Sequence, residues 1–291
     1  MHASLTGTRL GLLALLGLGS TLVACSGSTA SHTVDADRGS THALVSIERR
    51  DSPDQNLALA QAFASFVRTP PEVDPSVVRW LTGLELGLPD LGQCTSGTTR
   101  DGSMPLSPLD RVELLDAGDV TLRTADGRVE LAPRAFPAVT DQISGVVYTT
   151  RDRAARLPAA ERYGLDVSGG AELAPLTLDV EAPPLFEDVT LDGAPLEAGA
   201  RLRRSGAELG WAPGNERDLV YVTVSGRDGV RSAVCAFADV GRGVLPASVL
   251  PSAGAATLSL HRLRSVAMSA GVDTGELRFD FELLVPVEIG H

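Results

Sequence analysis

The sequence contains no lysine, and all 25 of its basic residues are arginine. Chemistry that needs a lysine side chain is therefore excluded, including Schiff-base formation, phosphate binding by a P-loop lysine and Ser–Lys catalysis. The 37 acidic residues outnumber the basic ones and give a formal net charge of −12. Nucleic-acid binding needs a basic surface that displaces counterions, so we expect no nucleic-acid partner.

Histidine is also scarce, with five in the chain. His2 lies in the N-terminal segment, His32 and His42 lie in a polar linker, and His291 is the last residue. This leaves His261 as the one histidine inside the expected folded body. A zinc site needs several His or Cys ligands, and a Ser–His–Asp triad would have to use His261. We therefore expect no metal, no cofactor and no catalytic residue.

The chain has three cysteines, Cys25, Cys94 and Cys235, and no CxxC motif, which leaves thioredoxin-type redox chemistry without support. Cys94 lies in a Gly-rich loop and Cys235 on an expected strand. In an oxidising compartment such a pair favours a Cys94–Cys235 disulfide. The alternative is that Cys235 is only a small buried residue.

Residues 1–25 have the order of a secretory signal: Arg9, an apolar run from Leu10 to Leu18, and then small residues. The run is too short to span a bilayer as a helix. The sequence Leu22-Val23-Ala24-Cys25 resembles the lipobox of bacterial secretory lipoproteins. The resemblance implies cleavage after Ala24 (signal peptide, 1–24) and lipidation of Cys25, with the membrane as a partner through this anchor. An ordinary signal peptide with a chance cysteine is the alternative.

The residue after the lipidated cysteine is Ser26 and not aspartate, which by the same resemblance implies the outer membrane, on its periplasmic face or the cell surface. Residues 25–42 are rich in Ser, Thr, Gly and Asp, a composition typical of a flexible tether.

The folded body reads as mainly β, with two β-sandwich-like domains. Short β-branched segments separated by turn residues recur through 43–181, and Asp126-Gly127 indicates a hairpin. Asp74-Pro75 followed by residues 76–81 predicts one short helix in this first domain, with Trp80 as a packing residue. The period of residues 57–67 is ambiguous between helix and strand.

Ala182-Pro183-Pro184 is the expected domain boundary, because proline lacks the N–H that a sheet ladder needs. A second series of short strands fills 182–291. The Trp211 segment with Pro213, followed by Tyr221-Val222-Thr223-Val224, resembles fibronectin type III and immunoglobulin-like sandwiches. Pro246, in the short segment 244–250, departs from that pattern. The resemblance implies a core position for Trp211.

Several polar groups are candidates for catalysis or for ligand binding. The acidic pairs Asp110/Glu113, Glu187/Asp188 and Asp280/Glu282 alternate with apolar residues or adjoin turns, as solvent-facing positions do. Ser168 lacks the first glycine of a nucleophile elbow and indicates a turn. The arginine groups 151/153/156 and 201/203/204 fit strand edges or the binding of an acidic glycan or lipid headgroup.

Two functions remain. The first is a non-catalytic envelope lipoprotein with a binding, adhesion or structural role, through protein or glycan contacts. The second is an envelope hydrolase acting on glycan or peptide through carboxylates. A pocket that gathers two or more acids near His261 would favour the hydrolase, whereas a smooth sandwich would favour the first function.

Overall fold

The computed structural model describes residues 39–52, 55–71, 73–74, 76, 78–79, 82–96, 112–139, 143–150, 157, 160–227 and 231–290. The described residues belong to one compact unit, Ala36–His291. The lipobox and Cys25 lie outside them, as do Trp80, Asp110 and the arginines at 151, 153 and 156. The predictions made for those residues therefore stay predictions.

The described part of the chain is mainly β, as predicted. Its strands are, in chain order, β1 (Ser40–Ser52), β2 (Gln55–Thr69), β3 (Cys94–Ser96), β4 (Val112–Leu114), β5 (Val120–Thr124), β6 (Gly127–Val139), β7 (Ile143–Thr149), β8 (Arg162–Val167), β9 (Leu176–Glu181), β10 (Thr190–Leu191), β11 (Ala194–Pro195), β12 (Ala200–Leu202), β13 (Gly206–Gly210), β14 (Leu219–Gly226), β15 (Arg231–Ala238), β16 (Arg242–Pro246), β17 (Gly254–Met268) and β18 (Thr274–Ile289). A 3-10 turn, Ala247–Val249, follows β16.

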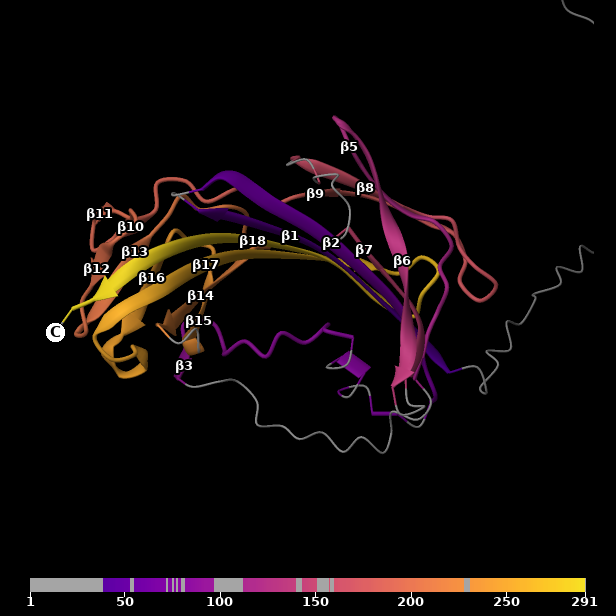
Figure 1. The fold of residues 1–291 in the computed structure, drawn as a ribbon, viewed down its shortest axis with the longest axis horizontal. Helices are drawn as coiled ribbons and strands as arrows, with labels where there is room; N and C mark the ends of the chain where they lie inside the picture. The colour runs from indigo at the N-terminus through magenta and orange to yellow at the C-terminus, as the bar shows by residue number, and fades with distance from the viewer. Residues whose placement is uncertain are drawn as a thin grey trace, which may run out of the picture. The chain divides into compact units, whose positions relative to one another are not determined.

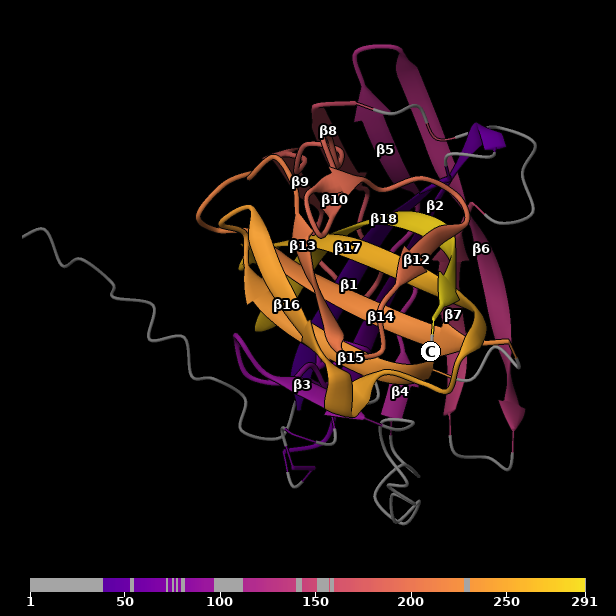
Figure 2. The same ribbon diagram turned by 90° about the vertical axis from the view of Figure 1, so that its left-hand side faces the viewer.

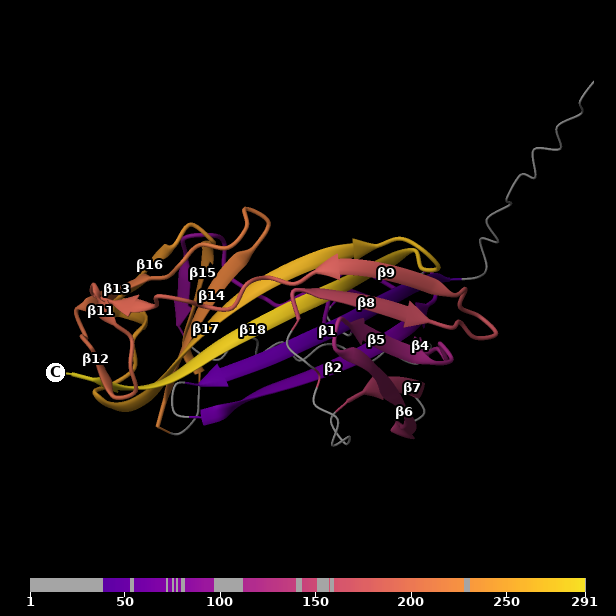
Figure 3. The same cartoon turned by 90° about the horizontal axis from the view of Figure 1, so that it is seen from above.

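One sheet has the strand order β3-β15-β14-β17-β18-β1-β2-β4-β7-β6-β5-β8-β9, with β12 added beside β18. Most neighbours are antiparallel, but β18 pairs in parallel with both β1 and β12, and β4 pairs in parallel with β7. The long strands β17, β18, β1 and β2 lie side by side through the middle of this sheet (Figures 1 and 3). A second, smaller sheet has the order β11-β10-β13-β16 and lies in front of β14, β15 and β17 in Figure 2.

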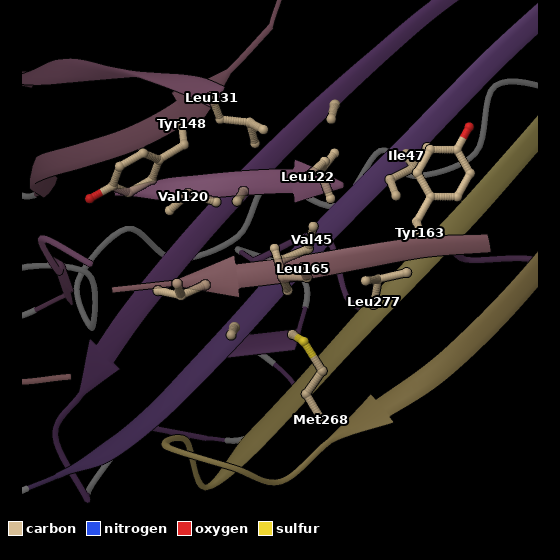
Figure 4. Close-up of a cluster of buried hydrophobic side chains, with 14 of the residues drawn as sticks. Val45, Ile47, Val120, Leu122, Leu131, Tyr148, Tyr163, Leu165, Met268 and Leu277 are labelled. Carbon is tan, nitrogen blue, oxygen red and sulfur yellow. The ribbon is translucent and has the colours of Figure 1, made fainter. Parts of the chain in front are cut away.

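Two hydrophobic cores form on the sheets. The first takes side chains from β1, β2, β5, β8 and the adjoining ends of β17 and β18, including Val45, Leu122, Leu165 and Leu277 (Figure 4). The second packs around Trp211 between the small sheet and strands β14, β15, β17 and β18. Both cores therefore draw on β17 and β18. The predicted domain boundary at 182–184 stays a prediction. The first core also takes residues from the C-terminal side of that boundary.

Residues 57–67, of ambiguous period in the sequence, belong to strand β2. Ala62, Ala64 and Phe66 point into the first core, while Gln61 and Phe63 are only half-buried. This two-residue alternation is the period of a strand with one covered face. Pairing with β1 along nearly its whole length, and not local propensity, selects the strand over the helix.

The predicted short helix at 74–81 falls partly outside the described residues. Within that segment the amide of Val78 donates to the carbonyl of Asp74, and Thr82 donates to Val78, with N···O distances of 3.2 and 2.9 Å. Asp74 also accepts a hydrogen bond from the amide of Ser76 through its side chain, at 2.7 Å. The side-chain contact is the one that an Asp at a helix start makes.

The predicted hairpin near Asp126-Gly127 is present between β5 and β6, but its turn is one residue earlier. Thr124 pairs with Gly127, so Ala125 and Asp126 form the two-residue loop. A second aspartate–glycine turn, Asp192-Gly193, lies between β10 and β11. Both residues there have positive φ, 52° and 80°, which is the backbone of a tight two-residue hairpin loop.

Candidate functional site

Polar side chains form three cross-strand rows on the face of the long sheet that is turned away from the cores. Directly paired residues in a sheet point to the same side, so register alone places them together. In the first row Ser46 pairs with Arg278 and Phe63, and Phe63 pairs with Thr149. In the second row Glu48 pairs with Asp280 and Gln61. In the third, His261 pairs with Tyr221 and Glu282, and Glu282 with Arg50.

The third row and Asp280 form a connected network around His261. The imidazole Nδ1 lies 2.9 Å from Asp280 Oδ1, and the Tyr221 hydroxyl donates to Asp280 Oδ2 at 2.5 Å. The imidazole also stacks on the Tyr221 ring, with centroids 4.2 Å apart. On its other side Nε2 lies 3.8 Å from Glu282 Oε1, and Glu282 pairs with Arg50. Asp280 and Glu282, predicted to face solvent, are instead mostly covered, with 20% and 11% of their side chains exposed.

This network orients each member through its neighbours. Asp280 accepts one hydrogen bond on each oxygen, so its carboxylate holds both the imidazole and the phenol in place. Glu282 lies between a cation, Arg50, and the imidazole. Such an arrangement fixes the imidazole through Nδ1, as the carboxylate of a triad does, and places a second carboxylate, Glu282, on the side of Nε2 where a triad has its nucleophile.

The second row opens into a pocket of about 510 Å³ next to this network. Glu48 and Asp280 contribute carboxylates, and Gln61 donates its amide to Glu48 Oε2 at 2.5 Å. Gly83 and Leu86 form the opposing wall. They belong to residues 82–93, which we name the cover segment, part of the purple trace drawn below the sheet in Figure 1.

The cover segment is fastened at both ends. Arg278 donates to the carbonyls of Gly83 and Leu84 at 2.6 and 2.7 Å, while its Nε pairs with Glu276. At the other end Gly92 donates to the carbonyl of Ala236 at 2.7 Å. Beyond Gly92, Cys94 forms the predicted disulfide with Cys235.

A second pocket, of about 580 Å³, lies at the segment between β9 and β10, residues 182–189, which we name the proline connector. Two arginines of β17 reach this connector from the sheet. Arg264 donates to the carbonyls of Glu181 and Ala182, and Arg262 donates to those of Pro184 and Leu185, all at 2.8 to 3.0 Å. The connector's carbonyl groups thus receive from arginine the hydrogen bonds that a sheet partner would otherwise supply.

The structure separates the other predicted candidates. Ser168 directly follows β8, where its hydroxyl accepts from the amide of Asp119 at 2.7 Å. Glu187 lines the second pocket, and Asp188 adopts a φ of 50°. Arg201, Arg203 and Arg204 are exposed on or beside β12, and Arg203 pairs with Asp192 at 2.8 Å.

Sequence reasoning missed Glu48, Gln61, Tyr221 and Arg278 as members of a site. No local signal in the sequence marks them. Glu48 and Arg278 enter the site through the parallel pairing of β1 with β18, which joins residues more than 200 positions apart, and Tyr221 enters it through the pairing of β14 with β17. Across the part of the chain that the structure describes, no group of three or more His, Cys, Asp or Glu could hold a metal ion. Nor does any helix among those residues have the length and apolar character needed to cross a membrane.

The titratable groups with shifted pKa values that lie outside the His261 network make structural contacts. Burial raises the pKa of Tyr148 to about 12; its hydroxyl donates to Asp116 at 2.9 Å and accepts from the amide of Ala117 at 2.7 Å. The pKa of Asp116 is lowered by the hydrogen bond from the Gly118 amide and then by that from Tyr148. A hydrogen bond from Arg123 lowers the pKa of Asp166.

No protein-family model and no curated protein matches the sequence. Among solved structures, the chain is similar to the FN1–FN3 domains of chicken CNTN1, at 13% identity over 76% of this chain and 77% of that one, with a TM-score of 0.23. It is also similar to the yeast delta-COP-I mu-homology domain, at 9% identity over 87% of this chain and 99% of that one, with a TM-score of 0.22.

Proposed function

We propose that the chain is a lipid-anchored protein of the bacterial cell envelope that binds a partner without turning it over. The lipobox supports the anchor at Cys25, and Ser26 supports the outer membrane. The Cys94–Cys235 disulfide fits an oxidising compartment outside the cytoplasm. The possible partners are an envelope protein or an envelope glycan.

The observation that carries the non-catalytic role is the contact set of His261. Asp280 holds its ring through Nδ1, and the ring stacks on Tyr221. The Glu282–Arg50 pair lies on the side of Nε2. A general base needs access to the proton that it abstracts, within hydrogen-bond reach of a substrate. Here the ring nitrogens are directed at two carboxylates, so the network rigidifies the sheet face beside the pocket.

A second function has a specific observation in its favour. The pocket brings Glu48 and Asp280 together from neighbouring strands, and Asp280 contacts His261. This is the gathering of acids near His261 that favours an envelope hydrolase, because glycoside hydrolysis uses two carboxylates across a cleft. We keep the hydrolase as the alternative, with Glu48 and Asp280 as its candidate carboxylates.

The anchor is tested in bacteria that express the full chain. Globomycin treatment, or the Cys25→Ala substitution, should give an uncleaved or mislocalised precursor on immunoblots of membrane fractions. Ser28→Ala serves as the control, since it changes the expected tether without touching the lipobox or the disulfide. Normal cleavage and membrane retention of Cys25→Ala would refute the anchor.

Catalysis is tested separately with purified protein and a panel of glycan, peptidoglycan and peptide substrates. We expect no turnover above buffer. Any activity found is retested with His261→Ala, Glu48→Gln and Asp280→Asn, with His42→Ala as the matched histidine control on β1. Turnover that disappears in one of the first three variants and persists in His42→Ala would put the hydrolase first.

A further inference from the structure

The pocket at the proline connector is lined by three glutamates, Glu161, Glu181 and Glu187, and has a volume of about 580 Å³. All three residues are exposed, and within the described part of the chain none of their side chains forms a hydrogen bond or an ion pair. The pocket therefore presents carboxylates for which the protein itself supplies no donor.

The two arginines that line the same pocket are already used by the protein. Arg49 donates to both oxygens of Asp51, at 2.9 and 3.2 Å. Arg264 donates to both oxygens of Asp218, at 2.6 and 2.8 Å, and to two backbone carbonyls. Because each arginine is neutralised by its own aspartate, the glutamates leave the pocket with an excess of negative charge. Such a pocket favours a cationic ligand.

Apolar side chains lie beside the glutamates. Phe281, Pro184, Leu185 and Pro213 line the pocket, and Leu185 is 38% exposed. Arginine and lysine carry their charge at the end of an apolar stem, which packs on such a surface while the charged head reaches a carboxylate. Among the residues that the structure describes, no three acids are placed to hold a metal ion. A basic side chain therefore suits this pocket better than a metal cation.

One wall of the pocket is the end of a sheet edge. β9 ends at Glu181 and, among the described strands, pairs with β8 alone. Directly after β9, the amide of Ala182 donates to the carbonyl of Glu161, at 2.8 Å. Backbone groups alternate in direction along an antiparallel strand, so the N–H and C=O groups of Thr177 and Asp179 point away from β8. This edge offers backbone hydrogen bonds to an added strand.

We infer that the pocket and the β9 edge bind an extended basic segment of a partner protein, which pairs its backbone with β9 and places an arginine or lysine side chain in the pocket. The inference rests on the proposed function, in which an envelope protein is one possible partner, and it assigns that partner's site. Arg262 and Arg264 hold the carbonyls of residues 181, 182, 184 and 185, so the pocket is formed before the segment arrives. A preformed site avoids the cost of ordering a loop on binding.

The test is fluorescence polarisation with the purified full-length protein in detergent and labelled hexapeptide pools. Each pool mixes valine and threonine around one fixed central residue, which is arginine, glutamine or glutamate. The arginine pool should bind. The other two pools should bind on the order of tenfold more weakly, because they lack the cation that the carboxylates attract. Added salt should weaken binding of the arginine pool, because it screens exposed charges.

Glutamate variants test the pocket. Glu161→Gln and Glu187→Gln should each weaken binding of the arginine pool about two- to fivefold, and the double variant on the order of tenfold. Both residues are exposed, so the melting temperature should stay at the parent value. Glu208→Gln, exposed on β13 in the smaller sheet, is the matched control and should bind as the parent does.

The β9 edge is tested from both sides of the contact. Arginine peptides with N-methylated backbones lack the amide donors of an added strand and should bind on the order of tenfold more weakly. Thr177→Pro removes an outward N–H from β9 and keeps the β8 ladder, since proline is tolerated where the N–H of an edge strand faces outward. This variant should bind the arginine pool weakly as well. If it does not fold, the N-methylated peptides still decide whether the edge is used.

Other outcomes would count against the inference or the function on which it rests. Equal binding of the three pools, unchanged binding in the double glutamate variant, or no binding by a protein that melts cooperatively refutes the basic segment, while the lipid anchor is judged by its own experiment. Full binding of the N-methylated peptides, or equally tight binding of arginine amide alone, refutes strand addition and with it the extended segment. Cleavage of the bound peptides keeps the site but overturns the non-catalytic function.

Discussion

Arg262 of β17 and Asp239 form an ion pair that is closed to solvent: Nε lies 2.8 Å from Oδ2, and neither side chain has any exposed surface. Asp239 also accepts from the indole of Trp211 at 2.6 Å, and the Arg262 guanidinium lies 4.5 Å from the centre of the Phe186 ring. Arg264, two residues further along the strand, pairs with Asp218 at 2.6 Å. The two arginines lie on β17, the strand that contributes to both cores, and they donate hydrogen bonds to the carbonyls of the proline connector.

Removing one partner of the Arg262–Asp239 pair should be strongly destabilising, because the other charge would be left buried and unpaired. We expect Arg262→Met or Asp239→Asn to lower the free energy of unfolding by about 3–5 kcal/mol. The double variant should lose less than the sum of the two. Urea denaturation of all four proteins measures this coupling, and strictly additive losses would contradict it.

The exposed pair Arg203–Asp192 is the matched control for that experiment. Arg203 retains 66% of its side-chain exposure, so solvent screens the pair. Arg203→Met should change the free energy of unfolding by less than about 1 kcal/mol.

Tyr148 should make the protein less stable in alkali. Its pKa is about 12 in the folded chain against 10.0 for the ordinary side chain, because burial disfavours the phenolate. The unfolded state therefore loses its proton first as the pH rises. This contribution to stability is fully present below pH 10 and is lost between pH 10 and pH 12.

Urea denaturation at pH values from 8 to 12 measures this loss. Tyr148→Phe should give a shallower decline above pH 10, with some slope remaining because burial also raises the pKa of Tyr163. At pH 8 the same variant should already be less stable, since it lacks the hydroxyl that contacts Asp116 and the Ala117 amide. An unchanged alkaline slope in Tyr148→Phe would assign the effect to other groups.

The disulfide should contribute strongly to stability, since Cys94 and Cys235 are 141 positions apart. Chain-entropy models give about 4–5 kcal/mol for closing so long a loop. We expect Cys94→Ala/Cys235→Ala to lose stability of this order and to be cut faster by protease near the cover segment. Mass mapping without reductant is the direct check, and two free thiols on the secreted protein would exclude the bridge.

A fragment of residues 183–291 should form the Trp211 core but associate with itself. It would carry Leu277 and Phe279, which are fully buried in the full chain, without the neighbouring strand β1 and without Tyr163 of β8, which packs on Phe279. Sedimentation velocity should show oligomers, and Leu277→Ser/Phe279→Ser should restore a monomer. A parent fragment that is monomeric and melts cooperatively would support a complete domain after the 182–184 boundary.

The sequence by itself determined the secondary-structure class, and its residue types excluded chemistry that needs a lysine side chain. Short segments of alternating apolar and polar residues between turn residues can bury one face only as strands, so the mainly-β prediction needed no partner information. The absence of lysine and the scarcity of histidine limited the chemistry in the same way, although His42, expected in the polar linker, lies on β1 in the folded body. Two cysteines within the body also sufficed to predict their disulfide.

Only the tertiary structure decided which residues meet. Glu48 and Asp280, or Tyr221 and His261, come together through strand pairing over long sequence separations, and no local pattern encodes that register. The carboxylates of Asp280 and Glu282 read as solvent-facing because their alternation with Phe281 is the pattern of a half-exposed strand. The His261 network and the neighbouring strands cover much of that face. The alternation of residues along one strand does not show which other residues cover its polar side.

The arginines of β17 show the same limit of sequence patterns, here for charged residues that are buried. Arg262 and Arg264 alternate with His261 and Leu263 and, by pattern alone, would be placed on either face. The structure turns them toward the cores because Asp239 and Asp218 and the carbonyls of the proline connector supply acceptors there. A buried charge is tolerated only where such partners exist, and their presence at one point in space is a property of the fold and not of the local sequence.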